Sequence, residues 1–140
     1  MNRRTAPLFA TYLLLIVAGI VIATVIGLVR TEDDPAAAST AARFSAAIRK
    51  HDGAAACRQL SAATIKSLEQ QEGARCEKAV LDVGLKGGSV SKSDVAERSA
   101  KVDVGEDGSV FLDNTRRGWL ITAFGCKPVK ARPYDCEVEE

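Results

Sequence analysis

The feature that most constrains this chain is an uninterrupted apolar stretch near its N-terminus. Residues 8–29 read LFATYLLLIVAGIVIATVIGLV and contain no charged side chain. A run of about 18 or more such residues predicts a transmembrane helix. At about 1.5 Å per residue this stretch reaches about 33 Å, which is enough to cross a hydrocarbon core of about 30 Å. The sequence therefore predicts a membrane anchor followed by a small domain.

The charges that flank the apolar stretch predict its orientation. Arg3 and Arg4 precede it, whereas Arg30 and then three acids at 32–34 follow it. Because basic residues are retained on the cytoplasmic side, the N-terminus is expected in the cytoplasm and the body outside. We therefore expect a single-pass protein of the cell membrane with an extracytoplasmic C-terminal domain.

A cleaved signal peptide is the alternative to an anchor. Its apolar region normally spans about 7–15 residues, so the longer stretch in this chain favours an uncleaved signal-anchor. The three alanines at 36–38 could nevertheless serve as a cleavage site, so the alternative stays open.

Three small residues share one face of the predicted span. Gly19, Ala23 and Gly27 recur at every fourth position, which is the pattern that lets two helix backbones approach closely. Small residues are also common in membrane helices that have no such role. The pattern predicts either a face for association with another membrane protein or a second copy, or only the ordinary composition of a span.

The rest of the chain has room for one soluble domain. Of 140 residues, about 110 follow the anchor, which is enough for one hydrophobic core. Basic and acidic residues are interspersed there in a near-neutral balance, which predicts neither a nucleic-acid site nor a polybasic lipid patch. The expected division is a cytoplasmic N-terminus at 1–7, the anchor at 8–29, a linker at 30–39 and the domain at 40–140.

Four cysteines, Cys57, Cys76, Cys126 and Cys136, lie in the predicted domain. An even number is typical of an oxidising compartment, which agrees with the predicted orientation. Four cysteines allow three connectivities. We expect Cys57–Cys76 and Cys126–Cys136, because each pair lies within one local segment. Zinc is not expected, because the sequence has no C-x-x-C pair and His51 is its only histidine.

The first half of the domain has the periodicity of helices. Between Pro35 and Lys50, apolar residues recur at three- and four-residue steps, and either Asp34 or Ser39 could cap this helix. Asp52 is expected to cap a helix at 53–60, and Ser61 a helix at 62–72 that Gly73 ends. A further short helix is expected at 76–81.

The second half changes to the alternation of strands. At 100–104, apolar and charged residues alternate, and the return strand at 109–114 places Val110 and Leu112 on the core face. The apolar segment at 119–125 predicts a central strand covered on both faces. Turns are expected at 105–108 and 115–118, a disulfide-closed loop at 127–135 and a short edge strand at 136–139. Helices followed by a strand meander predict an α+β domain, with the helices packed on one face of a curved antiparallel sheet.

Two long segments resemble a known superfamily. RFSAAIRKHDGAAACRQLSAATIKSL, at 43–68, combines a helix that ends in a charged Asp-Gly turn with a second short helix, and SAKVDVGEDGSVFLDNTRRGWLITAFGC, at 99–126, contains two hairpins and a closing G-W-x-I strand. They resemble the nuclear transport factor 2-like superfamily, especially small membrane-anchored envelope proteins of high-GC bacteria. The resemblance implies a cone with a pocket between helices and sheet. It implies no activity, because this fold hosts enzymes, transport factors and scaffolds.

The sequence provides no recognisable catalytic set. Enzymes of the resembled superfamily use an Asp, His or Tyr inside the cone. In this chain His51 and Asp52 lie in a helix-ending turn, and Tyr134 lies in the expected disulfide-closed loop. The glycines at 84–88 lack the spacing and the lysine-serine pair of a phosphate loop. We therefore name no catalytic residue, no cofactor and no metal ligand.

These observations favour a non-enzymatic, membrane-tethered module of the cell envelope. Its expected partners are the lipid bilayer and another envelope protein or a second copy of itself, without nucleic acid or metal. One alternative is a pocket for an apolar small molecule or lipid, lined by Phe44, Leu60, Phe111 and Trp119. Another alternative is a cone-fold enzyme that uses His51 or a buried acid as a base.

Overall fold

The computed structural model describes residues 16, 34–130 and 133–140. The chain divides into two compact units, Met1–Glu32 and Asp33–Glu140. The second unit is an α+β fold that contains helices and a five-stranded antiparallel sheet. This confirms the fold class expected for the domain.

The predicted anchor at 8–29 lies outside the described residues, apart from Ile16. The same holds for the small-residue face formed by Gly19, Ala23 and Gly27. In the part of the chain that the structure describes, no helix combines the length and the apolar character needed to span a membrane.

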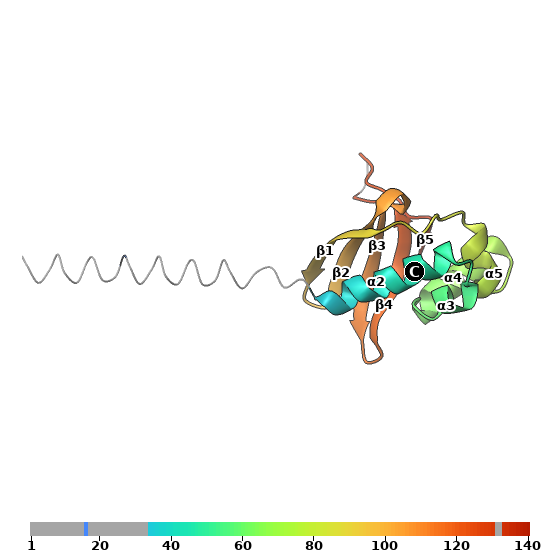
Figure 1. The fold of residues 1–140 in the computed structure, drawn as a ribbon, viewed down its shortest axis with the longest axis horizontal. Helices are drawn as coiled ribbons and strands as arrows, with labels where there is room; N and C mark the ends of the chain where they lie inside the picture. Colours follow the sequence, from blue (N-terminus) through green and yellow to red (C-terminus); the bar gives the residue numbers. More distant parts are fainter. Residues whose placement is uncertain (1–15, 17–33, 131–132) are drawn as a thin grey trace, which may run out of the picture. The chain divides into compact units, whose positions relative to one another are not determined.

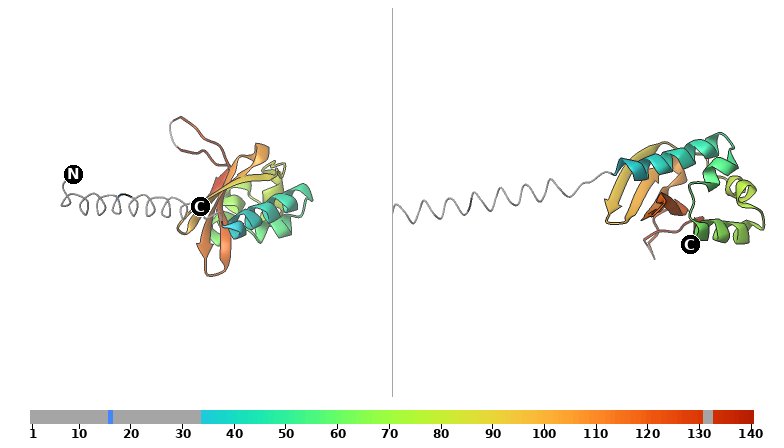
Figure 2. Two further views of the ribbon diagram at one scale, coloured as in Figure 1. Left: turned by 60° about the vertical axis from the view of Figure 1, so that its left-hand side comes forward. Right: turned by 90° about the horizontal axis from the view of Figure 1, so that it is seen from below.

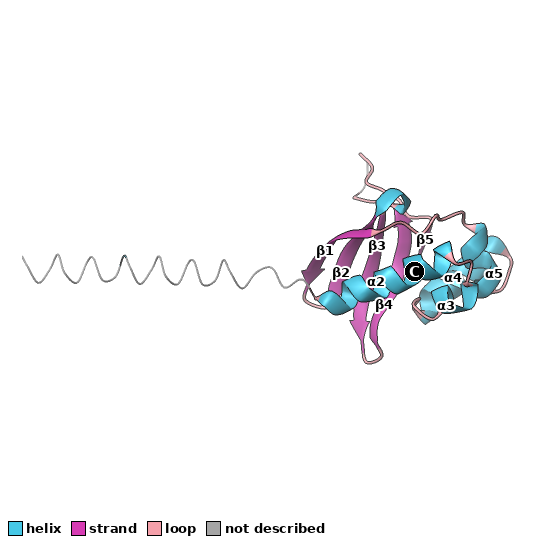
Figure 3. Ribbon diagram, viewed as in Figure 1, coloured by secondary structure: helices cyan, strands magenta, loops and turns pink. Residues whose placement is uncertain are grey.

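The sheet is a meander in which each strand pairs with the next one along the chain, in the order β1-β2-β3-β4-β5 (Figures 1 and 3). Tight turns join the first four strands, and a one-turn 3-10 helix, η1 (Gly105–Asp107), lies between β2 and β3. The strands are β1 Val90–Ala96, β2 Ser99–Val104, β3 Ser109–Thr115, β4 Gly118–Cys126 and β5 Val138–Glu139.

Helix α2 lies across one face of the sheet, where it contacts β1, β2 and β4 (Figure 2). Among the three shorter helices, α5 packs against both α3 and α4, α3 also contacts α2, and α4 also contacts β4 and β5. The helices are α2 Pro35–Arg49, α3 Gly53–Cys57, α4 Ala62–Glu72 and α5 Cys76–Asp82.

Short polar side chains cap α2, α3 and α4 where the sequence predicts them, whereas α5 has no side-chain cap. The Asp52 carboxylate accepts a hydrogen bond from the backbone N–H of Ala55 at 2.9 Å, at the start of α3. At the start of α2, the cap is Asp34 and not Ser39. Residues 35–39, which the expected division assigns to a linker, therefore form the first turns of α2. Each cap satisfies a backbone donor that the helix cannot satisfy itself.

The core lies between α2 and the face of the sheet that α2 covers. Buried alanines of α2 allow the helix to lie close to the strands, and the ring of Phe44 stacks obliquely on Phe124 at 5.4 Å between centroids. The main apolar residues contributed by the strands are Ala100, Val102, Val104, Val110, Leu112, Trp119, Ile121, Phe124 and Val138. This packed layer is the chief apolar driving force for folding.

Trp119 connects the two layers by a polar contact as well. Its indole Nε1 donates a hydrogen bond to the Asp34 carboxylate at 2.8 Å, while the other carboxylate oxygen accepts from the backbone N–H of Ala36 at 2.9 Å. One carboxylate therefore caps α2 and holds the first turn of that helix to the beginning of β4.

Three local features differ from the sequence expectations. Strand β1 was not expected at all. The helix expected at 53–60 ends at Cys57, and Leu60 instead forms a bridge with Ile121 of β4. Strand β4 is covered on both faces only in its second half, because Leu120 and other residues of its first half alternate between buried and half-exposed.

Both disulfides join the cysteines that the sequence predicts. Cys57–Cys76 ties α3 to the start of α5, and Cys126–Cys136 ties the end of β4 to the residues before β5. The second disulfide closes the loop between β4 and β5. Closing such loops restricts the unfolded chain and stabilises the fold.

Candidate functional site

The face of the sheet that α2 does not cover carries charged, hydroxyl and aromatic side chains. It is called the outer face below. Along β2 and β3, buried residues alternate with residues that point to this face, as expected for a strand with two different sides. The side chains on the outer face include Lys92, Asp94, Ser99, Lys101, Asp103, Ser109, Phe111 and Asp113.

Charged residues of β1 and β2 form a connected network on the outer face. The Nζ atom of Lys101 lies 3.2 Å from the Asp103 carboxylate and 3.8 Å from the Asp94 carboxylate. Lys92 lies 3.1 Å from Asp94. Because these side chains are partly exposed, each pair contributes little to stability. The network instead fixes where positive and negative groups are presented.

The two central charges of this network have shifted pKa values. Burial alone lowers the pKa of Lys101, but hydrogen bonding to Tyr134 and Asp103 outweighs burial and leaves that pKa above its ordinary value. The pKa of Asp103 is lowered, first because the Ser109 hydroxyl donates to its carboxylate at 2.7 Å and further because of Lys101. Both groups are therefore held in their charged forms at neutral pH.

An aromatic pair adjoins the charged network. The rings of Phe111 and Tyr134 meet edge to face at 5.0 Å between centroids, and the Nζ atom of Lys101 lies 5.7 Å from the centre of the Tyr134 ring. Tyr134 comes from the loop that Cys126–Cys136 closes. The disulfide-closed loop thus brings an aromatic side chain back onto the sheet.

A shallow hollow lies between the aromatic pair and the β1–β2 turn. Its volume is about 370 Å³, its walls are largely apolar, and charged side chains stand at its rim. Its lining residues are Asp94, Val95, Ala96, Ser99, Ala100, Lys101, Phe111, Leu112 and Asp113. An open hollow of this kind can receive one or two apolar side chains of a partner, with charged groups setting their register.

The four residues expected to line an internal pocket are not brought together. Phe44, Leu60 and Trp119 are buried in the core between helices and sheet. Phe111 is half-buried and lies on the opposite side of the sheet, next to Tyr134. The assignment of Phe111 to the same pocket was wrong because Phe111 sits between Val110 and Leu112, which face the core.

The candidate base His51 is exposed in the turn between α2 and α3, where its φ is 54°. The neighbouring Asp52 uses its carboxylate to cap α3. The structure brings no acidic side chain into hydrogen-bonding contact with His51 among the described residues. Both residues therefore lie in the helix-ending turn that the sequence predicts, and the Asp52 side chain caps α3 there.

The glycine-rich loop at 84–88 binds a carboxylate of the same chain. The two oxygens of Asp107 accept hydrogen bonds from the backbone N–H groups of Lys86, Gly87 and Gly88, at 2.8, 2.6 and 3.1 Å. The loop and η1 border a second hollow of about 250 Å³. Because Asp107 already uses these three donors, the loop offers them to no external anion.

Sequence reasoning missed the outer face as a candidate site. The alternation at 100–104 placed Lys101 and Asp103 on a polar face, which could have drawn attention to it. The contribution of Tyr134 had no signal in the sequence, because it depends on how the disulfide-closed loop folds back.

In comparisons with known proteins, no family model matches the chain, and neither a curated protein nor a solved structure matches it.

Proposed function

We propose that this chain is a membrane-tethered, non-enzymatic module of the cell envelope that binds a protein partner through its outer face. The observation that carries the proposal is the hollow beside Phe111 and Tyr134, in which an apolar floor is bordered by fixed charges. Interfaces between proteins combine these features, with aromatic residues near the centre and polar residues at the rim.

The proposed location follows from the sequence. The apolar stretch at 8–29 is long enough for a signal-anchor, and the basic residues before it favour a cytoplasmic N-terminus. Two disulfides in the following domain are typical of an oxidising compartment. An anchored domain of this kind encounters partners in or near the same membrane.

We also propose kinship with the nuclear transport factor 2-like superfamily. Its support is the order of elements, in which helices precede a strand meander and the longest helix lies on the sheet. A cone with an internal apolar ligand is less well supported as a function. Three of the four residues expected to line that pocket pack in the core, and the fourth lies across the sheet.

Crosslinking from the outer face in intact cells tests the proposed function. A photoreactive amino acid replaces Asp113, which is exposed and lines the hollow, in the full chain. The matched control carries the same amino acid at Lys66, which is exposed on α4. We expect a discrete adduct with another protein from position 113 and none from position 66.

A second variant connects the adduct to the hollow. Phe111→Ser in the chain labelled at Asp113 is expected to remove the adduct, because it removes the aromatic side chain beside the crosslinker. Circular dichroism of the purified variant checks that the fold is retained. Identical adducts from positions 113 and 66, or no adduct with any other protein, would contradict the proposed partner surface.

A further inference from the structure

The two edges of the sheet differ in what pairs with them. The backbone N–H of Ser61 donates to Ile121 at 2.9 Å, and that of Ile121 donates to Gln59 at 2.8 Å, so that the segment before α4 covers part of β4. Strand β5 pairs with the next part of β4. At the opposite edge, within the described residues, β1 pairs only with β2. The free side of β1 is therefore a template for a further strand.

The backbone groups on the free side of β1 follow from its turn. Ala96 and Ser99 are partners across a two-residue turn, and such a closing pair exchanges its backbone hydrogen bonds. Because hydrogen-bonded and non-hydrogen-bonded pairs alternate, the backbone groups of Asp94 also point towards β2. Those of Ser93 and Val95 therefore point away from the sheet, where an added strand can bind them.

The sequence of β1 is complementary to itself in the antiparallel direction. It reads VSKSDVA, with Ser93 between Lys92 and Asp94. We propose that two copies of the chain join through β1, antiparallel and centred on Ser93, so that their sheets become continuous. In this register Lys92 of each copy lies opposite Asp94 of the other, and opposite charges that face each other across strands stabilise the pairing.

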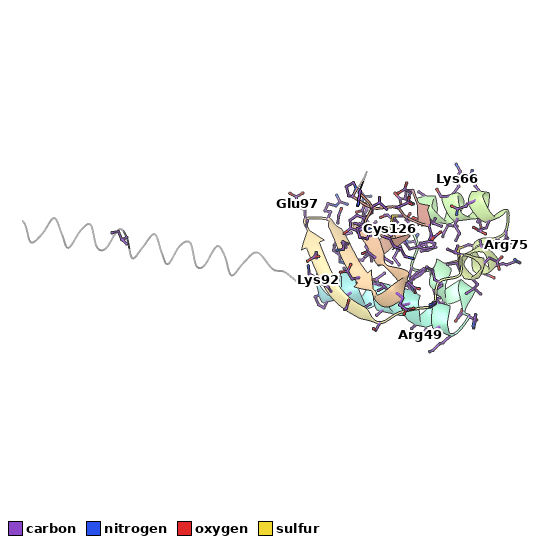
Figure 4. All side chains as sticks on the ribbon, turned by 90° about the horizontal axis from the view of Figure 1, so that it is seen from above. Arg49, Lys66, Arg75, Lys92, Glu97 and Cys126 are labelled. Carbon is purple, nitrogen blue, oxygen red and sulfur yellow. A yellow bond between two sulfur atoms is a disulfide. The ribbon has the colours of Figure 1, made fainter. Side chains whose placement is uncertain are left out.

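Charge distinguishes this register from its neighbour. An antiparallel pair centred on Asp94 uses the same outward backbone groups but places two Asp94 carboxylates opposite each other, which is destabilising. The side chains of Lys92 and Asp94 are 65% and 51% exposed, so they are accessible to a second copy. Figure 4 shows Lys92 on β1 and Glu97 at the tip of the following turn. The charges therefore select the register centred on Ser93.

Ser93 itself supports the same register. Its Oγ atom is buried and has no hydrogen-bond partner among the described residues. Ser93 borders a hollow of about 330 Å³ between β1 and the start of α2, which is also lined by Pro35. A buried hydroxyl without a partner is unfavourable. In the proposed pair the two Ser93 side chains lie directly opposite each other, where hydroxyl groups of neighbouring strands can form hydrogen bonds.

The pairing of two copies extends the proposed function. It rests on that function, because the membrane anchor is needed to make a small contact effective. A two-fold axis perpendicular to the sheet keeps both outer faces on the same side, so that the pair presents two copies of the partner surface together. The contact between two short strands is small. Anchoring both copies in one membrane raises their effective concentration and compensates for this.

Charge exchange on β1 tests the pairing. Two differently tagged copies of the full chain are expressed together, extracted in mild detergent and purified through one tag. Lys92→Asp in both copies, or Asp94→Lys in both copies, places like charges opposite each other twice, and we expect about tenfold less recovery of the second copy. One Lys92→Asp copy with one Asp94→Lys copy restores both attractions, and we expect recovery near that of the unmodified chain.

The control exchanges the same charges elsewhere. Lys78 and Asp82 form an exposed ion pair on α5, away from β1, so Lys78→Asp and Asp82→Lys are expected to leave recovery unchanged. Equal recovery for all β1 variants, or no restoration in the mixed pair, overturns the pairing. The Asp113 adduct with a different protein does not depend on β1. The crosslinking experiment therefore tests the partner surface separately, and either hypothesis can fail while the other holds.

Discussion

The two faces of the sheet are made by the same strands but differ in burial and in charge. The inner face is covered by α2 and consists of apolar residues such as Val102 and Leu112, which are fully buried. The outer face carries charges, and its aromatic residue Phe111 remains half-buried. Phe111 and Leu112 are neighbours in β3, but Leu112 belongs to the core and Phe111 belongs to the proposed partner surface.

This difference indicates which side chains of such a small domain can change to bind a partner without loss of stability. The inner face is needed for stability, because its buried apolar residues form a large part of the hydrophobic core. Changes on the outer face cost little because its side chains are partly solvated. The experiments below test this contrast.

The largest expected effect compares neighbouring residues of β3. Leu112→Ala should lower the free energy of unfolding by about 2–5 kcal/mol, because it leaves a cavity in the core. Phe111→Ala should lower it by about 1 kcal/mol, because it removes only the edge contact with Tyr134. Urea denaturation of the full chain in detergent measures both values. Equal losses would mean that the outer face belongs to the core.

An intermediate effect is expected at the polar contact of the inner face. Trp119→Phe should lower the free energy of unfolding by about 2 kcal/mol, because the Asp34 carboxylate loses a charge-assisted hydrogen bond. Combining Trp119→Phe with Asp34→Ala gives a double-mutant cycle, in which we expect a coupling of about 0.5 kcal/mol or more. Strictly additive losses would show that the bond contributes nothing to the attachment of α2.

The smallest expected effect concerns pH on the outer face. The folded-state pKa of Asp103 is lowered, so its contribution is present above the unfolded-state pKa and is lost as pH falls through the folded-state pKa. Asp103→Asn should therefore cost less than about 1 kcal/mol at pH 7, because the group is partly exposed. Urea denaturation at pH 7 and pH 3 should show this difference shrinking in acid. A difference that is the same at both pH values would refute the assigned cause.

Much of the local structure could be predicted because single residues determine it. Asp52 and Ser61 cap helices by their own side chains, and Gly73 ends α4 with a left-handed backbone, φ 62°, that glycine adopts without strain. The alternation at 100–104 correctly separated the two faces of β2. These signals act over a few residues and do not depend on the rest of the fold.

The features that escaped prediction depend on tertiary context. Strand β1 has only two apolar side chains larger than alanine, Val90 and Val95, among charged and small residues, because it lies at an edge and contributes little to the core. Tyr134 reaches Phe111 only through the loop closed by a disulfide. The candidate surface therefore combines an edge strand and a folded-back loop, whose sequences carry no periodic signal.

The hydrogen bond between Asp34 and Trp119 also has a mechanical consequence. Asp34 lies at the beginning of the second unit, and its carboxylate accepts hydrogen bonds from both the first turn of α2 and the indole at the beginning of β4. A pull from that end is thus shared between a helix and a strand at its point of arrival. The same bond places the sole tryptophan of the chain where its fluorescence can report whether this contact is intact.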